Sequence, residues 1–104
     1  MRLMAARAAA RVAADTAADT SARMRWAQAA HDWMRDELQD LRAGFSAGRV
    51  HARATAAVLA SWSANPDFAL LKEDGAAWSV IGDDTRRAWT ALRGEMEAFA
   101  AEIR

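Results

Sequence analysis

The sequence contains no cysteine and no apolar run long enough to cross a membrane. The absence of cysteine excludes disulfide bonds, thiolate metal sites and cysteine nucleophiles. A membrane-spanning helix needs about 20 predominantly apolar residues, and the alanine-rich N-terminal stretch is interrupted by Arg7 and Arg11. We therefore expect this stretch to be a helix rather than a signal peptide, in a cytoplasmic protein that does not enter a membrane.

The sequence also lacks an excess of charge of either sign, because 14 basic residues balance 14 acidic ones. The charges are unevenly spread: residues 1–64 carry nine basic and six acidic residues, whereas residues 65–104 carry five and eight. A neutral total argues against strong nonspecific nucleic-acid binding by a single chain. The asymmetry predicts a weakly basic part that faces nucleic acid and an acidic part that faces a protein partner.

Catalytic and cofactor motifs are missing as well. The sequence has no glycine-rich phosphate-binding loop and no G-x-S-x-G motif. Its two histidines, His31 and His51, are too far apart to form the helical H-x-x-x-H spacing of a metal site. We favour a buried His31 that sets the register of a bundle over a metal ligand or a phosphoacceptor. The sequence therefore predicts no enzymatic activity, no cofactor and no metal.

The stretch from Thr20 to Arg42 contains neither glycine nor proline and predicts a long helix at the centre of the fold. Its apolar positions recur at steps of three and four residues, which is the spacing of a coiled coil. We name these positions the central seam: Met24, Ala27, His31, Met34, Leu38, Leu41 and Phe45. Trp26 and Trp33 form a second stripe on another face. A helix with two apolar stripes needs cover on two sides, which predicts the central helix of a bundle or of an oligomer.

An alanine-rich stretch, residues 3–18, predicts an N-terminal helix because alanine is the strongest helix former. Since it carries few large apolar side chains, we expect residues 1–19 to be loosely packed. Capping residues predict a break near residues 19–21, with Asp19 or Thr20 as the cap of the central helix. One continuous helix through this point is the alternative.

Glycine and proline mark the later boundaries of the predicted helices. We expect the central helix to stop near Ala43-Gly44, and Ser46 to cap a third helix over about residues 47–63. Asn65-Pro66 predicts the start of another helix, with asparagine at its N-cap and proline in its first helical position.

The short helix that starts at Pro66 is expected to end at Asp74-Gly75, before an ordered linker over residues 76–82. Asp83 or Asp84 then opens the last helix, residues 83–104. Its apolar residues again recur at coiled-coil steps, and we name them the C-terminal seam: Trp89, Leu92, Met96, Phe99 and Ile103. The predicted fold is all-α, a helical hairpin or bundle of four to five helices in a single domain over residues 1–104.

Three aromatic residues, Trp62, Phe68 and Trp78, fall around the segment of residues 65–82. They form either core beneath a loop or an anchor surface for a partner, since tryptophan is a frequent interface anchor. The sequence leaves both interpretations open.

The supply of large core residues is small, because 29 of the residues are alanine. A chain of this size covers one coiled-coil seam more easily than two. We therefore predict a homo-oligomer joined through the central seam, and a larger protein partner bound through the C-terminal seam. The i, i+4 pairs Arg7 with Arg11 and Arg49 with Arg53 would form a basic field in such an oligomer and contact DNA weakly.

In its general plan the sequence resembles the small terminase subunits of tailed phages and of phage-like gene transfer agents. The resemblance covers the short helical chain, the central seam as an oligomerisation hairpin and the C-terminal seam as a tail. It implies a ring that hands DNA to a large terminase motor and has no enzymatic activity of its own. The helix-turn-helix usual in this family is not evident, so the resemblance implies weak, nonspecific DNA binding.

The rival interpretation is a small helical regulator, such as an antitoxin, an anti-activator or a transcriptional regulator, which acts by protein–protein binding. A third is a purely structural bundle within a larger assembly.

Overall fold

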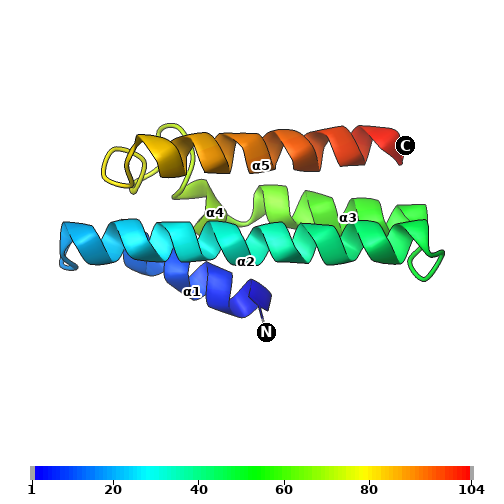
Figure 1. The fold of residues 1–104 in the computed structure, drawn as a ribbon, viewed down its shortest axis with the longest axis horizontal. Helices are drawn as coiled ribbons and strands as arrows, with labels where there is room; N and C mark the ends of the chain where they lie inside the picture. The colour runs from blue at the N-terminus through cyan, green and yellow to red at the C-terminus, as the bar shows by residue number, and fades with distance from the viewer. Residues whose placement is uncertain (1, 104) are drawn as a thin grey trace.

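The computed structural model describes residues 2–103, which form five helices joined by turns and contain no strand (Figure 1). They are α1 (Arg2–Ala14), α2 (Thr20–Ser46), α3 (Ala52–Ala64), α4 (Pro66–Ala69) and α5 (Asp83–Glu102). The predicted all-α helical bundle is thereby confirmed. None of these helices combines the length and the apolar character of a membrane span.

α2 is the element against which α1, α3 and α5 pack (Figure 1). α1 runs antiparallel to the N-terminal part of α2, and α3 runs antiparallel to its C-terminal part. α5 runs parallel to α2 over most of the length of α2. The indole Nε1 of Trp89 in α5 donates a hydrogen bond to the carbonyl of Ala27 in α2 at 3.1 Å. Further along, the rings of Phe45 and Phe99 meet edge to face, with centroids 5.7 Å apart.

α2 starts where the capping residues predicted it, but α1 ends at Ala14, before the expected end at residue 18. Asp19 is the N-cap of α2, and its Oδ1 accepts a hydrogen bond from the backbone N–H of Ala22 at 2.8 Å. This bond satisfies one of the four N–H groups that a helix start leaves without a partner. The alternative of one continuous helix was wrong.

α1 is packed tightly against α2, which corrects the expectation of a loosely packed N-terminus. The alanines of one face of α1 are buried: Ala6, Ala9, Ala10 and Ala13. Small side chains let two helix axes approach closely. The alanine face of α1 therefore packs closely against α2 although it carries no large side chain. Apolar area alone, read from the sequence, does not reveal this close approach.

A buried arginine side chain donates a hydrogen bond to the C-terminal end of α1. Arg23 is 8% exposed, and its Nε donates to the carbonyl oxygen of Ala13 at 2.8 Å. A cation at this position satisfies a terminal carbonyl and interacts favourably with the negative end of the helix dipole.

α2 continues past Gly44 to Ser46, so the predicted stop at Ala43-Gly44 was wrong. Gly44 is buried, and a Cβ there would lie 3.3 Å from Cγ2 of Val50. The glycine therefore provides room for the returning chain rather than ending the helix. α3 begins at Ala52 with His51 at its cap position, instead of being capped by Ser46.

The start of α4 follows the prediction: Asn65 Oδ1 accepts from the N–H of Asp67 at 2.9 Å, and Pro66 takes the first helical position. α4 ends at Ala69, earlier than expected, and turns occupy residues 70–82. A Cβ on Gly75 would collide with the carbonyl oxygens of Ala69 and Leu70, so only glycine fits this turn.

The linker over residues 76–82 is ordered as predicted, because its apolar side chains are core. Leu71, Ala77 and Ile81 are fully buried, and the N–H of Ala77 donates to the carbonyl of Leu70 at 3.0 Å. α5 begins at Asp83 as predicted, with Gly82 at its N-cap position and with Asp83 and Asp84 in its first turn.

The tight α1–α2 contact predicts that enlarging a buried alanine destabilises the chain. Ala10→Leu should lower the free energy of unfolding by about 1–3 kcal/mol, because the extra atoms have no space. Urea denaturation measures the effect, and Ala8→Leu, on the exposed face of the same helix, is the matched control. Equal stabilities of the two variants would show that α1 packs loosely after all.

Candidate functional site

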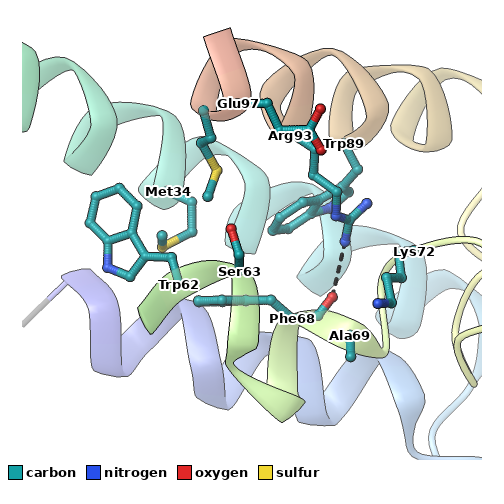
Figure 2. Close-up of a pocket in the computed structure, with 10 residues that line it drawn as sticks. Met34, Trp62, Ser63, Phe68, Ala69, Lys72, Trp89, Arg93 and Glu97 are labelled. Carbon is teal, nitrogen blue, oxygen red and sulfur yellow. Dashed lines mark hydrogen bonds between the residues drawn. The ribbon is translucent and has the colours of Figure 1, made fainter. Parts of the chain in front are cut away.

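A cavity of about 220 Å³ opens between α3, α4 and α5, with α2 as its floor (Figure 2). We call it the aromatic pocket. Its lining residues are Met34, Trp62, Ser63, Phe68, Ala69, Lys72, Trp89, Arg93, Met96 and Glu97.

The walls of the aromatic pocket are three rings and two thioethers. Trp62, Phe68 and Trp89 are 4%, 7% and 2% exposed, and the rings of Phe68 and Trp89 lie 6.1 Å apart between centroids. Met34 and Met96 complete the apolar surface, and methionine adapts its shape to different occupants. An apolar cavity of about 150 Å³ holds one benzene molecule. The pocket therefore has room for one ring or one branched aliphatic side chain.

One side of this pocket is formed at Asn65-Pro66, where α3 has ended and the new helix α4 begins. Asparagine caps α4 and proline fixes its first turn, so the chain changes direction between the end of α3 and α4. Trp62 from α3 and Phe68 from α4 consequently line the same cavity (Figure 2).

The rim of the aromatic pocket is polar and carries an excess of positive charge. Lys72 and Arg93 contribute two cations, and Glu97 contributes one carboxylate. Nη2 of Arg93 donates to the carbonyl of Phe68 at 3.0 Å (Figure 2), and its Cζ lies 5.3 Å from the ring centroid of Trp89. Burial lowers the pKa of the Arg93 guanidinium from its ordinary value, although an arginine remains charged at neutral pH.

Two shallow grooves run out from the aromatic pocket. One lies between α3 and α5, shares Ser63, Met96 and Glu97 with the pocket, and is otherwise lined by small or aliphatic residues: Ala56, Leu59, Ala60, Ala64 and Ala100. The other shares Lys72, Arg93 and Glu97 and continues to Glu73, Trp78, Thr90 and Gly94. The pocket is thus the deep point of an elongated depression.

The central seam belongs mainly to the core of this one chain. Ala27, His31, Met34 and Leu38 are buried by the chain's own helices, and Leu41 and Phe45 pack against the same core. Met24 is 41% exposed. α1, α3 and α5 already cover the buried four within one chain, so that the role of these residues in joining copies stays a prediction, which their burial disfavours.

The C-terminal seam is also core. Trp89, Leu92, Met96 and Phe99 are buried, and Ile103 packs against the core cluster. The helix face that was expected to bind a partner instead faces α2 and α3. Of these residues, Trp89 and Met96 also line the aromatic pocket, and Ile103 is partly exposed.

The predicted DNA-contacting arginines do not form one surface. Nε of Arg7 lies 2.9 Å from Oδ2 of Asp67, which neutralises it, whereas Arg11 is exposed. Arg49 and Arg53 are exposed near the turn between α2 and α3, at the end of the molecule away from the α1–α2 turn (Figure 1). The fold therefore separates the two basic pairs.

His31 has the buried position that its place in the seam predicted. It is 8% exposed, its Nδ1 lies 3.0 Å from Oδ1 of Asp32, and its ring meets Trp89 edge to face. Gln28 donates to Asp32 and accepts from the hydroxyl of Thr85, which ties α2 to α5. Within residues 2–103, no group of three or more histidine, cysteine or acidic side chains is arranged to hold a metal ion.

The aromatic cluster was the sequence signal that pointed toward the pocket. Trp62 and Phe68 line it, and Trp78 lies on an adjoining groove. All three rings pack in or against the core, and their use as an anchor surface for a partner stays a prediction. Lys72 and Arg93 were not predicted as site residues, because neither stands in a sequence pattern that indicates a place beside these rings.

Three comparisons, with protein-family models, with curated proteins and with solved structures, found no match. The geometry of the aromatic pocket is therefore the basis of the functional argument.

The Asp32 network predicts a pH dependence of stability. Partial burial raises the pKa of Asp32, but hydrogen bonds from His31 and Gln28, with the nearby charge of Arg35, outweigh it and lower the pKa. A carboxylate with a lowered pKa stabilises the folded chain above its unfolded pKa of about 4, and this contribution is lost as the pH falls through the folded value.

Asp32→Asn should therefore lower the free energy of unfolding at neutral pH, and the difference from the wild-type chain should shrink below about pH 3. Urea denaturation at both pH values measures it. A difference that is the same at the two pH values would mean that the charge of Asp32 contributes nothing.

Proposed function

We propose that the chain is a non-catalytic adaptor or regulator that binds another protein by holding one of its large apolar side chains in the aromatic pocket. The observation that carries this proposal is an open cavity walled by Trp62, Phe68 and Trp89. Small cores normally close around such rings, because packing at high density contributes to stability. A pocket left open at the surface is the kind of site that receives an interface anchor.

The surroundings of the pocket favour a protein partner over a small substrate. The two grooves extend the depression in opposite directions along α5, which suits an elongated chain segment. The walls offer hydrocarbon and thioether groups, which bind by excluding water.

The role in DNA packaging, which the resemblance to small terminase subunits implies, stays a prediction. It depends on a seam that joins copies and on arginines that form a basic field. The burial of the central seam and the separation of the basic pairs favour the adaptor or regulator class instead.

Blocking the pocket tests this proposal. A displayed library of random peptides should yield ligands with one invariant bulky apolar residue. Ser63→Trp places a large side chain at the mouth from an exposed position and should abolish their binding. Isothermal titration with a selected peptide measures the loss.

Ser61→Trp is the matched control, because Ser61 is exposed on the same helix and does not line the pocket. This control should bind like the wild-type chain. Selected peptides that bind both tryptophan variants equally, or a selection that yields no ligand, would contradict a binding role for the pocket.

A further inference from the structure

Arg93 is a half-buried cation whose charge has no carboxylate partner within residues 2–103. A guanidinium has five N–H donors, and the structure gives one hydrogen bond from it, to the carbonyl of Phe68. A charge that leaves water without a counter-ion is costly. Six other arginines each contact a carboxylate: Arg2, Arg7, Arg35, Arg42, Arg86 and Arg87. Among the described residues without an ion pair, the buried Arg23 donates to the carbonyl of Ala13 at the end of α1, and Arg11, Arg25, Arg49 and Arg53 are exposed to water.

Lys72 adds a second cation on the same side of the pocket (Figure 2). It is exposed and forms no ion pair among the described residues. Both cations also line the adjoining groove toward Trp78, together with the carboxylates of Glu73 and Glu97. Glu97, the carboxylate of the rim, lies one turn after Arg93 on α5, and no ion pair joins the two. The rim therefore presents two cations next to an apolar cavity.

This combination recognises an apolar group that stands next to a carboxylate. The rings receive the apolar part, and the guanidinium offers a fork of donors that matches a carboxylate. Because the depression is elongated rather than closed around the pocket, the occupant that fits it is a segment of polypeptide.

We propose that the aromatic pocket binds an acidic peptide segment of a different protein, in which a bulky apolar side chain enters the pocket and a neighbouring aspartate or glutamate binds Arg93 and Lys72. This inference rests on the proposed function and names the chemistry of its partner.

A second copy of the chain fits this site poorly. Within residues 2–103, the large apolar side chains that are exposed are Met4, Met24 and Trp26. Arg25 stands between Met24 and Trp26, and the charged residues nearest to Met4 in the sequence are Arg2 and Arg7. These flanking charges have the same sign as Lys72 and Arg93, so they would oppose docking.

Two capped peptides test the inference, each with a central phenylalanine flanked on both sides by glutamate in one and by glutamine in the other. Titration into the ¹⁵N-labelled chain is followed through the indole N–H signals of Trp62 and Trp89, which line the pocket. The glutamate peptide should bind about tenfold more tightly, the difference that one good charge-assisted contact supplies. Rising salt should reduce this difference.

Three variants assign the effect to the rim. Arg93→Gln should reduce the preference for the glutamate peptide to about twofold or less while the glutamine peptide still binds. Arg87→Gln, on the same helix but paired only with Asp84, should leave the preference unchanged. Glu97→Gln removes the rim carboxylate from an exposed position and should strengthen binding of the glutamate peptide by about two- to threefold.

The outcomes separate the two proposals. Equal binding of both peptides, or a preference that survives Arg93→Gln in a chain whose circular dichroism is native, would overturn the acidic-partner inference and leave the pocket as a binding site. Loss of the preference in Lys72→Ala, which lies on the surface, supports the inference even where Arg93→Gln fails to fold.

No shift of either indole signal by either peptide would overturn both proposals. A ligand-free chain whose solution mass is that of a dimer, and which Ser63→Trp returns to one chain, would mean that the occupant is a second copy.

Discussion

The long apolar seam of α2 is the constraint on which the rest of the structure depends. α2 has 27 residues and is about 40 Å long at 1.5 Å per residue, whereas α1 and α3 have 13 residues each. Neither short helix can cover the seam alone. The chain solves this by placing α1 along one part of α2, α3 along the other and α5 along most of its length (Figure 1). The covering helices bury different side chains: α1 buries alanines, whereas α5 buries aromatic rings.

The aromatic pocket follows from that arrangement. α3 ends at Ala64, and the chain restarts as the single turn of α4, so the space beside α5 is filled by the rings of Trp62 and Phe68 rather than by a continuous helix. Where the helices diverge, a cavity remains between these rings and the thioethers of Met34 and Met96, although the side chains themselves are at most 9% exposed. The same divergence brings the carbonyl of Phe68 to Arg93, which holds a cation at the mouth. The site is therefore a consequence of how α2 is covered.

The fold was more predictable from the sequence than the site. Capping chemistry is local, so Asp19 and Asn65-Pro66 marked helix starts correctly. The role of Gly44 depends on Val50 of the next segment, and a local rule cannot include that contact. The heptad steps identified both seams, but periodicity does not say whether the covering helix belongs to the same chain. Arg93 stands beside the pocket only because α4 restarts where it does, and no sequence pattern encodes that contact.

The central claim is that one chain covers the seam of α2 by itself. Light scattering after size exclusion tests it most directly, combined with circular dichroism at the same dilute concentration. The account predicts a helical species with the mass of one chain, 11.3 kDa, and helicity that does not change on dilution. A species of several chains that loses its helicity as it dissociates would contradict the account, because the seam would then need other copies to be covered.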